Sequence, residues 1–70
     1  MIENNYLNQS ASSNYDDLVI RNAGYAGMSI LTDSSSAGGV MFGDESDNDV
    51  GAIIYNHSNN TMQFNTNAAG

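Results

Sequence analysis

The chain has 70 residues and a mass of 7.4 kDa, and eight acidic residues against a single basic one give it a formal net charge of −7. Such a balance excludes the Lys and Arg clusters that bind nucleic-acid phosphates or anionic membranes. The chain has no Cys for disulfides or thiolate zinc sites, no apolar run near the roughly 20 residues that span a bilayer, and no signal-peptide pattern at its start.

The small size of the chain limits the core that it can build alone. Domains below about 70–80 residues rarely gain more than a few kcal/mol from their own core, and disulfides, a metal or oligomerisation usually supplement it. Leu, Ile, Val and Phe are scarce here, whereas Asn, Ser and Gly are abundant. Because disulfides are excluded, we expect apolar side chains to be buried between chains.

A strand-like pattern begins at residue 16. Residues 1–15 show no sustained hydrophobic period, and we expect a connector or a poorly ordered N-terminal segment there. In residues 16–70, five segments each carry two large apolar residues two positions apart, which places both on one face of a β-strand. These pairs are Leu18 and Ile20, Met28 and Ile30, Val40 and Phe42, Ile53 and Tyr55, and Met62 and Phe64. Turn-forming residues separate the pairs, so the sequence predicts an all-β fold of short strands.

The last two segments give the clearest local prediction. Residues 53–56 and 61–64 flank the polar sequence His-Ser-Asn-Asn at 57–60. A four-residue loop of turn formers is a common β-hairpin connection. We therefore expect a hairpin with its turn at residues 57–60.

Several motifs within residues 16–67 resemble a known family. The clearest is Gly-x-Ile-x-Tyr-Asn-His-Ser at 51–58, followed by Met-x-Phe at 62–64; shorter blocks are Leu-Val-Ile at 18–20, Gly-Met-Ser-Ile at 27–30 and Gly-Val-Met-Phe-Gly-Asp at 39–44. On these motifs, the chain resembles a segment of bacteriophage tail fibres and tailspikes that commonly precedes an endosialidase-type intramolecular chaperone.

The resemblance implies a parallel, intertwined homotrimer, built as a β-prism or as a fibre similar to a triple-stranded β-helix. It implies a structural part of the virion tail fibre, extracellular when assembled and involved in host attachment. Its partners would be neighbouring fibre domains and a host-surface glycan or protein receptor. We expect the trimer interior to be built from the five apolar pairs: Leu18, Ile20, Met28, Ile30, Val40, Phe42, Ile53, Tyr55, Met62 and Phe64. The sequence shows no set of acid, base and nucleophile, so we expect neither an enzyme nor a cofactor.

The acidic stretch at residues 44–49 is the main candidate for a metal site. Asp44, Asp47 and Asp49 are its candidate calcium ligands, because Ca²⁺ takes six to eight oxygen ligands. The spacing does not match an EF-hand, and a solvated loop is the simpler interpretation. A calcium-stabilised adhesin repeat therefore stays open as an alternative function.

Three further residues have a functional and a structural interpretation. The single histidine, His57, suits a general base or a metal ligand, but its place in a turn favours a structural hydrogen bond. Arg21 is the only basic residue, and we expect it to pair with Asp16, Asp17 or Asp33, from a neighbouring chain if strands are exchanged. Tyr25, between two glycines, is the best exposed aromatic candidate for stacking on a sugar. It makes a glycan- or receptor-binding fibre tip the other alternative.

Overall fold

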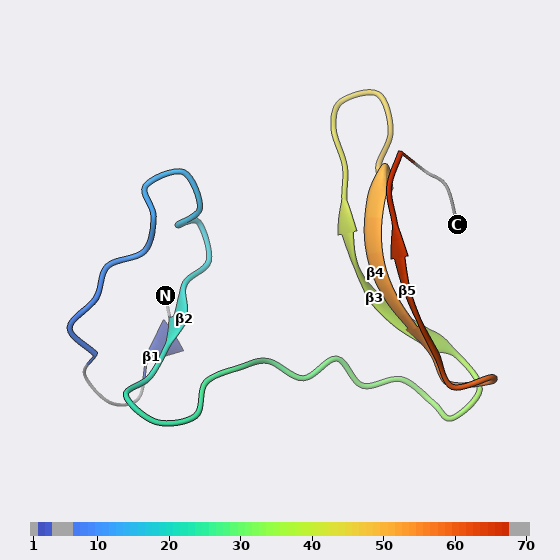
Figure 1. Cartoon of the computed structure of the whole chain (residues 1–70), viewed down its shortest axis with the longest axis horizontal. Coiled ribbons are helices and arrows are strands. Elements are labelled where there is room, and N and C mark those ends of the chain that lie inside the picture. Colours follow the sequence, from blue (N-terminus) through green and yellow to red (C-terminus); the bar gives the residue numbers. More distant parts are fainter. Residues whose placement is uncertain (1, 4–6, 68–70) are drawn as a thin grey trace.

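The computed structural model describes the backbone of residues 2–3 and all atoms of residues 7–67. This part of the chain contains five strands and no helix, as Figure 1 shows: β1 (Ile2–Glu3), β2 (Ile20–Arg21), β3 (Ala37–Phe42), β4 (Gly51–Asn56) and β5 (Thr61–Asn65). β1 pairs with β2 in parallel, and the other strands form an antiparallel sheet in the order β3-β4-β5. The all-β prediction is confirmed for these residues.

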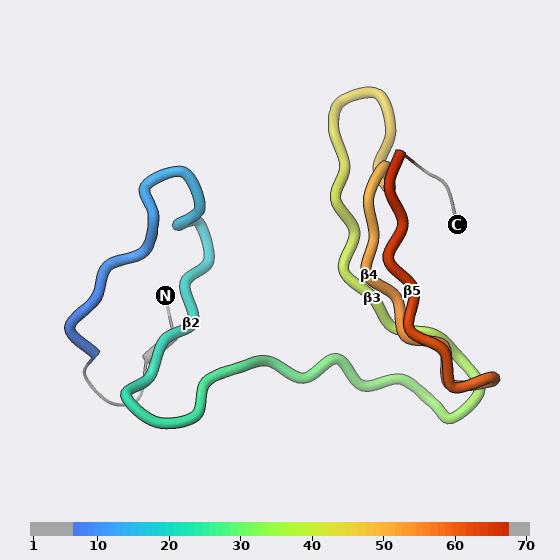
Figure 2. The backbone as a smooth tube through the Cα atoms, viewed as in Figure 1, coloured from blue at the N-terminus to red at the C-terminus, as the bar shows by residue number. Residues whose placement is uncertain are grey.

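The molecule is thin. Its principal extents are 38 × 31 × 14 Å, and Figure 2 follows the chain from the N-terminal part, through an extended segment, into the three-stranded sheet. No second layer covers this sheet within the described residues, and Ala52 is their one buried hydrophobic residue. A single layer leaves both sheet faces open unless another surface covers them.

The β4–β5 hairpin has its turn at the expected residues. β4 ends at Asn56 and β5 begins at Thr61, and Asn56 pairs with Thr61 across the turn. The Asn56 side-chain oxygen accepts hydrogen bonds from the backbone N–H of Ser58 (3.0 Å) and from its hydroxyl (2.8 Å). Asn60 takes the left-handed conformation with φ 56°, which Asn tolerates better than most residues. The hairpin prediction is confirmed.

The strand expected at Met28 and Ile30 does not form, so that prediction is wrong. Residues 25–33 are extended but have no ladder partner in this structure. The spacing of two gives these residues a common face, but a strand also needs a neighbouring backbone for its N–H and C=O groups.

The N-terminal part of the chain also differs from the expectation. β1 lies within residues 1–15, which we expected to form a connector, and pairs with β2, where Ile20 is opposite Ile2. The predicted N-terminal segment (residues 1–15) and the predicted β segment (residues 16–70) are therefore joined by backbone pairing between β1 and β2. Leu18 lies just outside β2, and its side chain is exposed.

Gly43, at the start of the loop between β3 and β4, lies close to the backbone of Asn48. A Cβ atom at this position would lie 2.8 Å from Cα of Asn48 and 2.9 Å from its carbonyl carbon and oxygen. Backbone atoms cannot move aside as the end of a flexible side chain would. Close approach of the two backbone segments thus requires a glycine here.

We therefore expect Gly43→Ala to destabilise the fold by roughly 1–3 kcal/mol, the usual cost of overpacking. Gly27→Ala is the matched control, because a Cβ at Gly27 would meet nothing within 4 Å. Its effect should stay within about 0.5 kcal/mol. Urea unfolding followed by circular dichroism measures both, and equal stability of the two variants would contradict the close approach at Gly43.

Candidate functional site

One face of the β3-β4-β5 sheet carries six of its large apolar side chains, and Met41 and Ile54 lie on the other face. Residues opposite each other in an antiparallel pair point to the same side of a sheet. Val40 is opposite Ile53, Ile53 is opposite Phe64, and Tyr55 is opposite Met62. With the alternation along each strand, this register places six predicted interior residues on one side: Val40, Phe42, Ile53, Tyr55, Met62 and Phe64. We call this side the apolar face.

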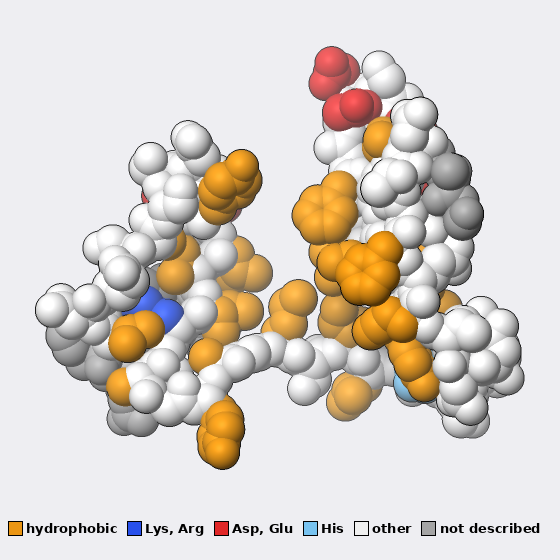
Figure 3. Space-filling view, viewed as in Figure 1, with side chains coloured by type: hydrophobic (Ala, Val, Ile, Leu, Met, Phe, Trp, Pro, Cys, Tyr) orange, Lys and Arg blue, Asp and Glu red, His pale blue; other side chains and the backbone are white. Residues whose placement is uncertain are grey.

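The apolar face is largely open to solvent. The exposed fractions of Phe42, Met62 and Phe64 are 57%, 59% and 71%, and Val40, Ile53 and Tyr55 are half-buried. Figure 3 shows hydrophobic side chains running along the sheet in the view drawn. Contiguous exposed apolar patches of this kind mark interaction surfaces.

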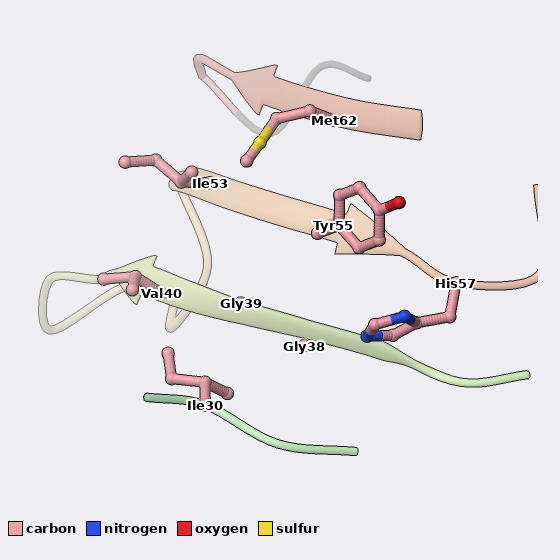
Figure 4. A pocket seen from close by; sticks show the side chains of 8 residues that line it. All are labelled: Ile30, Gly38, Gly39, Val40, Ile53, Tyr55, His57 and Met62. Atoms are coloured by element: carbon pink, nitrogen blue, oxygen red, sulfur yellow. The ribbon is translucent and has the colours of Figure 1, made fainter. Parts of the chain in front are cut away.

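A pocket of about 300 Å³ lies at the end of the apolar face nearest the β4–β5 turn (Figure 4). Gly38 and Gly39 form part of its lining, together with Ile30, Tyr55 and Met62. A Cβ at Gly38 would lie 3.2 Å from Cγ2 of Ile30. Absence of a side chain at Gly38 thus leaves room for Ile30 against the sheet.

His57 forms the polar edge of this pocket. Its ring meets Tyr55 edge-on, with centroids 4.9 Å apart and an interplanar angle of 75°. Its backbone N–H donates to the Ser36 carbonyl at 3.1 Å, and the Tyr55 hydroxyl donates to Oδ1 of Asn60 at 3.2 Å. These contacts favour the structural interpretation of His57, because they fix the turn against the sheet.

The acidic loop between β3 and β4 is organised by its own carboxylates. Oδ1 of Asp44 accepts hydrogen bonds from the backbone N–H groups of Ser46 (2.9 Å) and Asp47 (3.0 Å). A hydrogen bond with the Asp47 side chain, followed by the repulsion of its charge, raises the pKa of Asp49. In the described residues, no three side chains of His, Cys, Asp or Glu gather in a group that could hold a metal ion. The carboxylates of Asp44 and Asp47 accept the backbone hydrogen bonds that shape the loop.

The remaining candidates lie away from the sheet. Tyr25 is fully exposed, and the Asn22 side-chain amide donates to its carbonyl oxygen at 2.9 Å. The guanidinium of Arg21 donates to the Gln9 carbonyl. Met28 and Leu18 are exposed, whereas Ile20 is half-buried in β2. The structure thus brings only Ile30 to the six residues of the apolar face.

Two features of the site were not found by sequence reasoning. Gly38 and Gly39 are among the turn-forming residues that separate the apolar pairs in sequence, but they lie in β3 and line the pocket. The hydrogen bonds that the Asn56, Asn59 and Asn60 side chains accept at the hairpin turn were also missed. Consecutive glycines next to a strand-like apolar pair, and Asn residues close together in a turn, are the signals that could have indicated them.

Comparison with known proteins gives no relationship: no family model, no curated protein and no solved structure matches the chain. Nor does the described part of the chain contain a helix of the length and apolar character needed to cross a membrane.

The turn that leads into β3 depends on an ionised carboxylate. Hydrogen bonds from the side chain of Ser36 and from the backbone and side chain of Ser35 lower the pKa of Asp33. A lowered pKa means that this contribution to stability is complete above the unfolded value of about 3.9 and is lost as the pH falls through the folded value.

We expect Asp33→Asn to lower the melting temperature by a few degrees near pH 7. This deficit should shrink as the pH falls below the unfolded value of about 3.9 and disappear below the lowered folded value, where the native carboxyl is also neutral. Glu45→Gln removes the same charge from another loop and should not reproduce this profile. Thermal melts of the three proteins between pH 2 and pH 7 test it. A deficit for Asp33→Asn that is constant across this range would contradict the role of the ionised form.

Proposed function

We propose that this chain is a structural, trimerising segment of a bacteriophage tail fibre or tailspike, a non-enzymatic part of the virion that is extracellular when assembled. Its partners would be two further copies of itself, the neighbouring fibre domains and, beyond them, a host-surface receptor. The observation that carries the proposal is the open apolar face. The motif resemblance at residues 16–67 gives the protein class.

Burial of the apolar face between copies would supply the stability that one chain lacks. Complete burial of one large apolar side chain contributes about 1.5–3 kcal/mol. Phe42, Met62 and Phe64 each retain more than half of their exposure in the single chain, so most of this contribution is still available. In a trimer, three such faces would meet around one axis and form the interior as a β-prism.

Charge is distributed in a way that permits this assembly. Three copies would carry a net charge of −21, three times −7, which keeps fibres apart from one another. The residues of the apolar face are all uncharged, and the acidic loop lies beyond the end of the sheet at one tip of the molecule (Figure 3). Repulsion between copies is therefore weakest where contact would be made.

The mass in solution tests the proposal directly. We expect light scattering on a size-exclusion column to give three times the single-chain mass of 7.4 kDa at every concentration tried. A folded species with the mass of one chain would overturn both the trimer and the fibre assignment.

Two neighbouring substitutions in β3 separate the apolar face from the opposite one. Phe42→Asp should abolish the trimer, because it would bury an uncompensated charge. Met41→Asp is the matched control: Met41 is 52% exposed, close to the 57% of Phe42, but lies on the other side of the sheet. It should leave the mass at three chains. Trimers from both variants, or from neither, would contradict the assignment of the apolar face as the interior.

A second candidate function, a glycan contact in a fibre tip, is favoured by the full exposure of Tyr25 at a bend held by Asn22. It predicts that Tyr25→Ala loses binding on a glycan array, while Tyr15→Ala, which removes another exposed tyrosine, retains it. The absence of any glycan signal from the native protein would remove this function.

A further inference from the structure

The sheet has an unpaired edge at β5. β5 pairs with β4 on one side, and no other strand of the described chain lies along its other side. β3 is the other edge strand, and Ile30 and Thr32 of the extended segment lie over its Gly38 on the apolar face, with their methyl groups 3.2 and 3.5 Å from a Cβ built there. The edge of β5 away from β4 is thus open in the described residues.

β5 has none of the features that keep free edges from pairing. Natural proteins protect such edges with charged residues, Pro, bulges or very short strands. β5 is five residues long, with the sequence Thr-Met-Gln-Phe-Asn, and the sequence contains no charged residue after Asp49 and no Pro at all. An edge of this kind is suited to receive another strand.

The same chain contains an extended segment that has a strand pattern without a strand partner. Residues 27–32 are extended, with Met28 and Ile30 two positions apart. Ile30 lines the pocket on the apolar face, and Met28 remains 64% exposed. No charged residue lies between Arg21 and Asp33. Although the chain has a net charge of −7, neither this segment nor β5 carries a charged residue. The two segments can therefore approach each other without electrostatic repulsion between their own side chains.

We propose that residues 27–32 of one copy pair with the open edge of β5 in the next copy, as a fourth strand that joins the sheets of the trimer. The inference rests on the proposed function, which gives the number of copies as three. What it adds is the identity of the backbone segments that pair between copies. Contact between two different edges is heterologous, and a heterologous contact closes into a ring when the rotation permits it. Closure would pair the β5 edge of every copy.

The positions of residues along the strand direction predict the register between residues 27–32 of one copy and β5 of the next. Ile30 lies against Gly38, Gly38 is opposite Tyr55, and Tyr55 is opposite Met62. Rotation about an axis along the strands keeps these positions, so Ile30 of one copy would meet Met62 of the next.

The direction of pairing follows from the apolar pattern. In the antiparallel sense, Met28 would meet Phe64 and both apolar pairs would match. In the parallel sense, Met28 would instead face the turn residue Asn60. The antiparallel register is therefore favoured, and it places Ser29 opposite Gln63 on the side away from the apolar face.

Disulfide cross-linking tests this pairing, because the native chain contains no Cys. We expect the double variant Ser29→Cys/Gln63→Cys to give covalent dimers and a covalent trimer on a non-reducing gel after mild oxidation. Each single variant lacks one half of the contact and should give no covalent trimer. Ser29→Cys/Asn59→Cys, which moves the second thiol to the hairpin turn, should cross-link at least tenfold less.

The mass of the reduced double variant separates the two levels of the proposal. A species with the mass of three chains that yields only monomer bands on oxidation would overturn the β5 pairing while leaving the trimer intact. A reduced species with the mass of one chain that yields only monomer bands would overturn both.

A second pair of variants keeps the pairing testable if the cysteines disturb assembly. Met28→Lys should shift trimer dissociation to at least tenfold higher protein concentration, since Met28 would lie on Phe64. Leu31→Lys should not, because Leu31 is 89% exposed and out of phase with Met28 and Ile30. Equal effects of the two substitutions would overturn the pairing.

Discussion

The cross-strand register of the three-stranded sheet is the constraint on which the rest of the structure depends. Val40, Ile53 and Phe64 lie opposite one another, and the period of two along each strand puts Phe42, Tyr55 and Met62 on the same side. A slip by one residue would divide these side chains between the two faces. The register instead concentrates them on one face of a layer that nothing in the described chain covers. An exposed apolar face of this kind is suited to contact with another surface.

Polar side chains hold the loops where a larger protein would use buried contacts. Asp33, Asp44 and Asn56 each accept hydrogen bonds from backbone N–H groups two or three residues further along the chain. Asx-type bonds of this sort stabilise turns without apolar burial. The abundance of Asn, Ser and Asp is therefore explained by the turns themselves, which fix where β3, β4 and β5 begin.

Period-two spacing was sufficient to predict the strands that have neighbours in the chain. Val40 and Phe42, Ile53 and Tyr55, and Met62 and Phe64 all lie in strands, because antiparallel partners are supplied by the segments next to them in sequence. Met28 and Ile30 show the same spacing but no ladder, since spacing gives a common face and not a partner. The parallel pairing of β1 with β2 could not be predicted, because a two-residue ladder leaves no periodic signal. The pocket at Gly38 depends on Ile30, which comes from a segment outside the sheet, so local sequence did not indicate it.

The single layer also determines how the chain reaches its native state. Ordering each residue costs about 1–2 kcal/mol of backbone entropy, and an isolated hairpin is marginal in water because little apolar area is lost to solvent when it forms. With Ala52 as the one buried hydrophobic residue in the described chain, most of the compensating burial can come only at an encounter with another surface. For copies that share their apolar faces, folding and association become one event, and its rate rises with chain concentration. Nascent chains released close together from one message would complete their structure faster than the same chains diluted in bulk solution.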